Sequence, residues 1–203
     1  MYMKVELEDI AFWMDAIRNS EDKNRTLESF WKGQLRSKVW LIEVLSEKNS
    51  YNNPSIAIHG GWNGVLASLL FNSDIDPIHI TSIDIDPACE EIARTINKRQ
   101  EMEGRFTAVT ADMTKHQSLA DIIINTSCEH ITQQQYDEWL ELQPSTALFV
   151  LQGNNYFDHK EHIRCSKDID EFVKQSRINP LFSGEFETSK YKRYMIIGRK
   201  KVG

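Results

Sequence analysis

Short apolar runs and longer segments with helical spacing alternate along the chain after residue 54. The runs are rich in β-branched residues and predict strands at 56–58, 78–83, 106–109, 121–125, 147–151 and 194–197, with a shorter one near 185–188. Between them, apolar residues recur every three or four positions, which predicts helices at 64–71, 88–100, 133–142 and 169–175. This alternation is typical of a doubly wound α/β fold with a mainly parallel, Rossmann-like sheet. The short link between the last two strands predicts a terminal hairpin, with one antiparallel strand at or near the edge.

The first fifty residues follow a different pattern and are expected to be helical. Apolar spacing predicts one helix over 7–17 and a second helical stretch that begins near Thr26, with a polar loop at 19–25 between them. We therefore expect two parts, an N-terminal helical segment at 1–50 and a doubly wound domain at 51–203. The simpler interpretation of the segment is a helical layer on the sheet. The alternative is a lid over a ligand cleft, with side chains from Trp31, Arg36, Lys38 or Trp40.

Composition and charge argue against several classes of protein. No apolar run approaches the roughly 18 residues of a membrane span, and the N-terminus lacks a basic segment followed by an apolar one, so we expect a cytoplasmic protein without membrane contact. Three widely spaced cysteines argue against a disulfide framework. The net charge of −6 disfavours nucleic acid as a partner, although basic residues gather at 190–201. Whether the chain forms a homo-oligomer stays open.

The stretch from Ile56 to Asp86 predicts a ligand site. It reads as a strand, a glycine-bearing turn, an apolar helix and a second strand that ends on Asp84, twenty positions after Gly64. Glycines let the backbone turn sharply and approach a ligand closely, and the new helix presents unpaired N–H groups. A carboxylate at the tip of the next strand can accept both hydroxyls of a ribose. We therefore expect a nucleoside ligand between the turn and Asp84.

From Ile56 to about Gly198 the chain resembles the class I S-adenosylmethionine-dependent methyltransferases, whose sheet has seven strands with the last antiparallel. Five stretches match that family in order and spacing. They are the glycine turn at 58–64, Ile-Asp-Ile-Asp-Pro at 83–87, Thr-Ala-Asp-Met at 110–113, the run at 121–131 that ends in Glu-His-Ile, and the closing strands at 148–152 and 194–198.

The resemblance implies that the chain binds S-adenosyl-L-methionine. Asp84 would then accept the ribose hydroxyls, Ile85 would lie beside the adenine, and Asp112 would accept from the adenine amino group. The implied cofactor residues are Gly60, Gly61, Trp62, Asn63, Gly64, Asp84, Ile85, Asp112, Met113, Asn125, Thr126 and Ser127.

Two positions of the glycine turn depart from the family. Ile58 stands where members usually have an acid, and Trp62 replaces the middle glycine. The methionine end of the cofactor would therefore be held differently. The indole of Trp62 points either into the cleft or under the following helix, since large aromatic side chains are mostly buried.

Polar residues follow the fourth and fifth strands, whose carboxyl ends should face one cleft. His130 is the natural general base because an imidazole titrates near neutrality. Its structural alternative is that 129–131 only leads into the next helix. Cys128 is interpreted as a small buried residue and not as a nucleophile. The catalytic candidates are His130, Glu129 and Tyr156.

The segment 154–165 is the most distinctive part of the sequence, with carboxamides, a phenol, histidines and a cysteine. We interpret it as a polar loop that binds substrate. A metal site at His159, His162 and Cys165, with Glu129 and His130 close by, is the less favoured alternative, because the spacing of three needs a helix and no Cys-x-x-Cys pair supports it. Arg164 and Arg193 could pair with an anionic group of the substrate. The substrate candidates are Asn154, Asn155, His162 and Arg164.

Three functions are compatible with these residues. The leading one is methyl transfer from S-adenosylmethionine to a small polar molecule. The second is a different use of the same cofactor, namely transfer, cyclisation or lysis involving its aminocarboxypropyl arm. The third is a methyltransferase of RNA or protein, or an inactive binding module with this fold.

Overall fold

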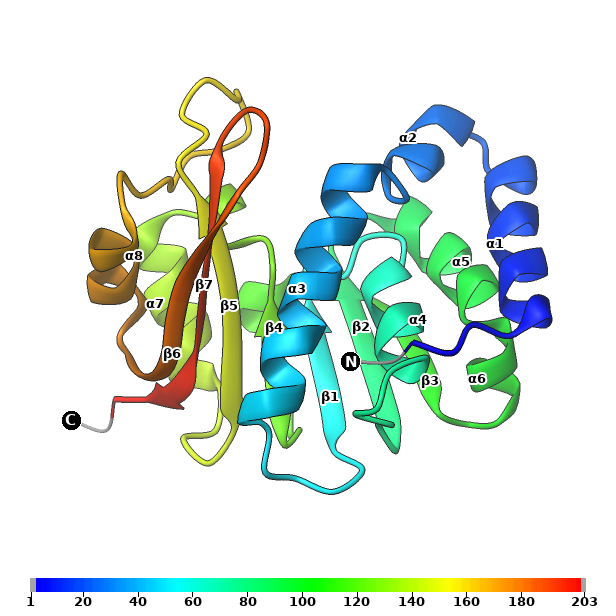
Figure 1. Ribbon diagram of the computed structural model, residues 1–203, viewed down its shortest axis with the longest axis horizontal. Helices are drawn as coiled ribbons and strands as arrows, with labels where there is room; N and C mark the ends of the chain where they lie inside the picture. Colours follow the sequence, from blue (N-terminus) through cyan, green and yellow to red (C-terminus); the bar gives the residue numbers. More distant parts are fainter. Residues whose placement is uncertain (1–2, 202–203) are drawn as a thin grey trace.

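The computed structural model describes residues 3–201, which form one seven-stranded sheet in the order β3-β2-β1-β4-β5-β7-β6 (Figure 1). Strand β7 runs antiparallel to both of its neighbours, and all other neighbouring pairs are parallel. The predicted mainly parallel sheet with an antiparallel last strand is therefore confirmed. The strands are β1 (Ser55–His59), β2 (His79–Asp84), β3 (Phe106–Thr110), β4 (Ile122–Asn125), β5 (Leu148–Asn154), β6 (Ile178–Glu187) and β7 (Lys192–Lys200).

Of the four helices predicted after residue 54, three agree with the structure and one differs. α4 (Val65–Phe71), α7 (Gln133–Leu142) and α8 (Ile169–Ser176) lie where apolar spacing predicts them. The predicted helix at 88–100 is two helices, α5 (Pro87–Ile96) and α6 (Lys98–Met102), which meet at Asn97. Asn97 leaves helical geometry at φ −106° and ψ 30° and donates from its side chain to the Gly64 carbonyl, so the break joins α5 to the glycine turn.

The N-terminal segment also differs in detail from the prediction. Its first helix is α1 (Leu7–Asn19), and the second stretch is broken into α2 (Lys23–Glu28) and α3 (Lys32–Lys48). α2 begins inside the predicted loop because the Asp22 carboxylate accepts from the Arg25 N–H and caps the helix. The break before α3 falls at Trp31, whose backbone is extended. Strand β6 is also longer than the short strand expected near 185–188.

Side chains on the two faces of the sheet build two separate cores, as the period of two in a strand requires. Ile122 and Ile124 of β4 pack under α1, α3, α4 and α5, whereas Ile123 packs under α7 and α8. β4 and β5 are buried along their whole length, which explains their continuous apolar sequence. The helices on both faces hold the carboxyl ends of the strands in fixed positions.

The N-terminal segment shares the first of these cores. Leu41, Ile42 and Leu45 of α3 are fully buried against the sheet. The Arg99 guanidinium of α6 donates to the buried Asp9 carboxylate of α1 at 3.0 and 2.7 Å. α2 contacts the loop after β2 through a more exposed ion pair, between Arg25 and Asp86 at 2.6 Å. Whether the segment moves as a lid stays a prediction.

Two further observations concern the setting of the site. The chain order reverses between β1 and β4, and in open α/β sheets ligands bind at such a switch point, beyond the carboxyl ends of the strands. Across residues 3–201, every helix is too short or too polar to cross a lipid bilayer.

Candidate active site

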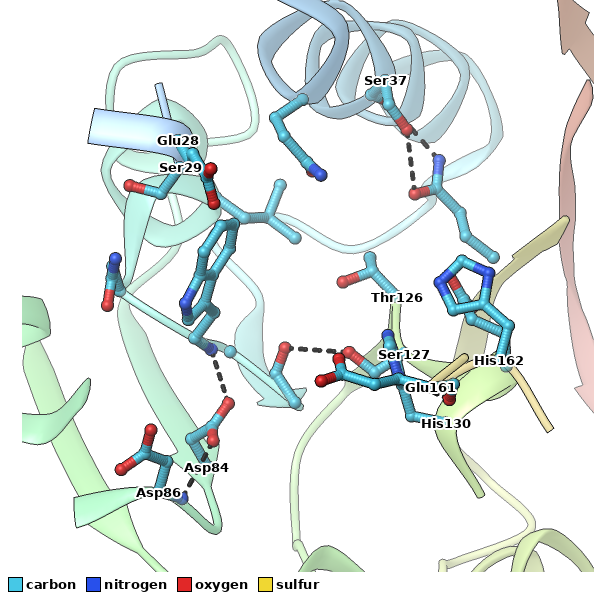
Figure 2. A pocket seen from close by; sticks show the side chains of 18 of the residues that line it. Glu28, Ser29, Ser37, Asp84, Asp86, Thr126, Ser127, His130, Glu161 and His162 are labelled. Atoms are coloured by element: carbon cyan, nitrogen blue, oxygen red, sulfur yellow. Dashed lines mark hydrogen bonds between the residues drawn. The ribbon is translucent and has the colours of Figure 1, made fainter. Parts of the chain in front are cut away.

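A cleft of about 1200 Å³ opens over the carboxyl ends of β1, β2 and β4. Its upper wall is formed by α2 and α3, and its far end by the loops after β4 and β5 and the turn between β6 and β7. Figure 2 shows Asp84 and Asp86 at one end, Thr126 and Ser127 in the middle, and His130, Glu161 and His162 at the other end. The volume exceeds the range of about 300–1,000 Å³ that one small ligand needs, so the cleft has room for two ligands side by side.

The glycine turn has the geometry that only glycine tolerates well. Gly60 and Gly64 have φ values of 68° and 74°, in the left-handed region. A Cβ at Gly60 would lie 2.5 Å from the Ser127 hydroxyl, and one at Gly64 would lie 2.9 Å from the Ala93 methyl. The turn is therefore packed against β4 on one side and α5 on the other. This close packing brings the first helix turn of α4 to the edge of the cleft.

Asp84 is held by the backbone of the same turn. Its Oδ2 accepts from the Trp62 N–H at 2.7 Å, and its Oδ1 accepts from the Asp86 N–H at 3.1 Å. The carboxylate is therefore in direct contact with the backbone of the turn, and both line the same cleft. Ile85 is 69% exposed at this end, and Asp112 caps the 3₁₀ turn η1 (Met113–Lys115). Hydrogen bonds from Thr114 lower the pKa of Asp112, which keeps this carboxylate charged and able to accept.

Trp62 and Asn63 occupy the part of the turn that departs from the family pattern. Trp62 has a positive φ of 47°, which is uncommon for a residue with a side chain. Its indole is partly exposed and lines the cleft, which decides between the two orientations that the sequence left open. Asn63 is 1% exposed, and both polar atoms of its side chain lack a partner within the described residues. Because buried amides are normally hydrogen-bonded, Asn63 is suited to contact a ligand.

The far end of the cleft is organised around Glu129, which lies in the 3₁₀ turn η2 (Cys128–His130). Its side chain is only 3% exposed and forms an ion pair with Arg193 of β7. The same Oε1 accepts from the Asn154 amide at 2.7 Å, and Arg193 also donates to the Thr126 carbonyl at 2.6 Å. Residues from β4, β5 and β7 are thereby joined in one buried network.

Two histidines lie beside Glu129, one on each of two loops. The His130 and His162 ring centroids are 4.9 Å apart. Burial lowers the pKa of His162. Tyr156 stacks on Tyr191 at 5.2 Å, so the loop after β5 rests on the turn between β6 and β7. The structure thus brings the predicted catalytic residues His130, Glu129 and Tyr156 to one end of the cleft.

Lys38 of α3 is a site residue that the sequence suggests only as part of a lid. It lines the cleft, and burial lowers its pKa to about 7, with the charge of Arg193 acting in the same direction. The other three lid candidates do not line the cleft. Trp31 is 70% exposed, Arg36 lies over the Phe186 ring, and Trp40 stacks on Phe186.

Four predicted contact residues need correction, because their side chains lie outside the lining of the cleft. Asn125 is fully buried and uses its Oδ1 to accept from the Ser127 N–H. Arg164 is 7% exposed, lies 4.0 Å over the Tyr136 ring and donates to Gln133. Asn154 supports Glu129, and Asn155 accepts from the Lys192 N–H. All four side chains bond to neighbouring protein groups and so stabilise the loops around the cleft.

None of the three cysteines lines the cleft. Cys128 is fully buried, and burial raises its pKa to about 12, so the prediction of a small packing residue is confirmed. Cys165 bonds to Asn154 and does not join the two histidines near Glu129. The metal alternative on His159, His162 and Cys165 therefore does not form as a set.

Comparison with known proteins supports the fold at low sequence identity. No protein-family model matches the chain, and no curated protein sequence matches it. Among solved structures, the pyocyanin biosynthetic protein PhzM is similar at a TM-score of 0.67 and 11% identity, over 93% of this chain and 62% of PhzM.

Two other structures extend the comparison. Magnesium protoporphyrin IX methyltransferase (ChlM) from Synechocystis PCC 6803, solved with bound S-adenosylmethionine, is similar at a TM-score of 0.66 and 14% identity, over 95% of this chain and 91% of ChlM. The N-methyltransferase NodS from Bradyrhizobium japonicum WM9 is similar at 0.62 and 11%, over 82% of this chain and 96% of NodS. The chain therefore has the fold of the class I S-adenosylmethionine-dependent methyltransferases.

Proposed function

We propose that the protein binds S-adenosyl-L-methionine and transfers its methyl group to a small polar molecule. The observation that supports this most directly is the direct hydrogen bond between the Gly60–Gly64 turn and the Asp84 carboxylate, both of which line one cleft. The turn presents helix N–H groups and a close-approaching backbone, and Asp84 presents a carboxylate to the ribose. Asp112, Ile85 and Met113 would hold the adenine. A similar structure, ChlM, was solved with this cofactor bound.

Methyl transfer needs little covalent help from the protein. The sulfonium methyl is strongly activated, so the enzyme has to align the nucleophile and take its proton where it has one. Two groups are suited to take this proton. One is His130 at the substrate end, and the other is Lys38, whose pKa of about 7 leaves much of it neutral at physiological pH. The Thr126–Ser127 edge between them and the glycine turn is where the methyl group would pass.

The substrate end favours a small molecule that carries polar groups. Lys38 and the Glu129–Arg193 pair give this part of the cleft a polar lining, and Tyr156 and Tyr191 supply a stacked aromatic wall. Cleft walls on several sides suit a compact ligand better than an RNA duplex. The net charge of −6 also gives nucleic acid little electrostatic attraction.

Product analysis tests this proposal. Purified protein is incubated with S-adenosylmethionine and a metabolite extract, and mass spectrometry follows both the cofactor and the extract. We expect S-adenosylhomocysteine to accumulate together with a metabolite that gains the mass of one methylene group. The Lys38→Met variant provides the matched control for background reactions. Binding of the cofactor without any turnover in a broad extract would favour a binding module.

A second use of the cofactor is favoured by one observation at the methionine side. Trp62 replaces a glycine and lines the cleft there, so the methionine arm has different surroundings from those of the family pattern. Transfer or cyclisation of the aminocarboxypropyl arm would release methylthioadenosine. The same mass spectra separate the two reactions, since methyl transfer releases S-adenosylhomocysteine.

A further inference from the structure

Three groups at the substrate end of the cleft have the arrangement of a metal site. Glu129, His130 and His162 each offer one ligand atom, and these atoms lie within 4.8 Å of one another. Ligand atoms bound to one tetrahedral ion at about 2.0–2.2 Å lie about 3.3–3.6 Å from one another. The ligand atoms therefore have to approach by up to about 1.5 Å, and a movement of the exposed His130 side chain achieves this. Figure 2 shows His130 and His162 next to each other at this end of the cleft.

Both imidazoles are fixed in the tautomer that a metal requires. His130 Nδ1 lies 3.2 Å from the Glu161 backbone oxygen, and His162 Nδ1 lies 3.2 Å from the Tyr156 backbone oxygen. A carbonyl oxygen only accepts, so each Nδ1 carries a hydrogen and donates it. The lone pair of each ring is therefore on Nε2. Metal-binding histidines have this pattern, with the second ring nitrogen donating to a carbonyl or carboxylate.

The third ligand is a carboxylate oxygen that the protein leaves unused. Glu129 Oε1 is occupied by Arg193 and Asn154, but Oε2 is buried and has no hydrogen-bond partner within residues 3–201. An unpartnered carboxylate oxygen in a buried position is costly unless something binds it. The side chain lines the cleft, so the free oxygen is within reach of a ligand there. Two neutral imidazoles and one carboxylate form a donor set suited to first-row divalent metals.

We propose that Glu129, His130 and His162 bind one first-row divalent metal ion through Oε2, Nε2 and Nε2. Three protein ligands leave at least one coordination position open, as in catalytic zinc sites. This position faces the cleft and would hold an oxygen of the methyl acceptor. His130 is then a ligand and not a base, so removal of the acceptor proton falls to Lys38. The metal site itself does not depend on the proposed methyl transfer, because it can be measured without cofactor or acceptor.

Calorimetry and absorption spectroscopy on the full chain test the site. The protein is freed of metal with a chelator and titrated with Zn²⁺, and then with Co²⁺, whose visible bands report coordination geometry. We expect one equivalent to bind. His130→Ala and His162→Ala should each weaken binding at least about tenfold, because each removes one of three ligands. Glu129→Gln should weaken it as well.

Matched controls keep the test independent of folding and of the proposed function. His79→Ala removes a histidine near the opposite end of the sheet and should bind both metals as the wild type does. Each variant is also titrated with S-adenosylmethionine, so that loss of the cofactor site is seen separately from loss of metal. Equal metal affinity in the wild type, His130→Ala and His162→Ala would overturn the proposal. So would the absence of binding at millimolar Zn²⁺ in protein that still binds the cofactor.

Discussion

The two ends of the cleft are the proposed cofactor end at Asp84 and the proposed substrate end at Glu129, and they are built in opposite ways. At the cofactor end, Asp84 accepts from two backbone N–H groups that belong to the turn and to its own loop. At the substrate end, Glu129 is paired with Arg193, which lies 64 positions away in the chain. The first end depends on local backbone geometry, and the second depends on side chains brought together by the tertiary fold.

Buried polar atoms without partners lie at both ends. At the substrate end they are Glu129 Oε2 and Arg193 Nε, whereas at the cofactor end the Asp84 oxygens are satisfied and the unpartnered atoms are those of the Asn63 amide. A buried polar atom without a hydrogen-bond partner destabilises the folded protein, and such atoms are found mainly at functional sites. Each end thus keeps buried atoms available to a ligand, which are charged groups at the substrate end and a neutral amide at the cofactor end. The following predictions test this difference, from the largest effect to the smallest.

Removal of one partner from the Glu129–Arg193 pair should have the largest effect on stability. Arg193→Met leaves the Glu129 charge buried without its main partner, and broken buried pairs typically cost about 3–5 kcal/mol. We expect a loss of this size in urea unfolding. Lys192→Met is the control. Lys192 is next to Arg193 in β7 and forms an exposed ion pair with Glu185 of β6, so its loss should change stability little. A similar small loss for both variants would show that the network is not buried in solution.

Replacement of Lys38 should affect turnover more than binding. Only the neutral amine takes a proton, so the rate should rise with pH through about 7 and level off above it. Lys38→Met should lower kcat about 100-fold and remove this rise, with little change in the affinity for cofactor. His130→Gln should retain the rise. A pH profile of unchanged shape in Lys38→Met would assign the proton transfer to another group.

Replacement of Asp84 should lower the affinity for the cofactor, by a smaller factor than Lys38→Met lowers kcat. Asp84→Ala leaves ribose hydroxyls unpaired in a desolvated pocket, which costs about 2 kcal/mol or about 30-fold in affinity. Asp84→Asn, which can still accept from the Trp62 N–H, should lie between alanine and the wild type. Calorimetry with S-adenosylmethionine measures both. Wild-type affinity in the alanine variant would contradict the assignment of Asp84 to the ribose.

The pH dependence of stability tests the burial of His59, which lies beneath the glycine turn. His59, directly before Gly60, is fully buried, accepts from the Trp139 indole N–H and pairs with Ser118. Burial lowers its pKa to about 3, below the value of about 6.5 in an unfolded chain, so the unfolded state binds the proton first as pH falls. The contribution of His59 to the free energy of unfolding is therefore constant above about pH 6.5. Below that pH it should decrease by up to about 1.4 kcal/mol per pH unit.

His59→Gln separates this contribution from that of the carboxylates, which titrate at lower pH. The variant should have a lower stability overall and a flatter profile between pH 6.5 and 4.5, as followed by urea unfolding at several pH values. His79→Gln should keep the slope of the wild type. A slope that survives in His59→Gln would assign the pH dependence to other histidines.

The sequence predicts the geometry around Asp84 better than the geometry around Glu129, for a physical reason. Gly60, Gly64 and Asp84 are required by local backbone geometry, and a local requirement leaves a pattern within thirty residues. The Glu129–Arg193 pair has no such pattern, because only the strand order places β7 beside β5. Arg164 resembles a substrate-binding residue in sequence, yet it lies over Tyr136 in the second core.

The apolar spacing also does not predict where helices break or which of their polar side chains reach the cleft. Apolar spacing continues through 88–100, and nothing in it shows that Asn97 leaves the helix to bond Gly64. In the same way, Lys38 lies on a helix whose apolar face is predicted correctly, but its access to the cleft depends on how α3 crosses the sheet.

The unequal attachment of the two first helices has a consequence for how ligands exchange. The contact that ties α2 to the loop after β2, between Arg25 and Asp86, is one-third or more exposed on both sides, and such pairs contribute under about 1 kcal/mol. The contact beneath α1 involves a fully buried Asp9. Thermal motion alone can part the first contact, while the second persists. If the proposed nucleoside ligand passes α2, added salt should therefore speed its binding and release, while α1 and α3 stay packed on the sheet.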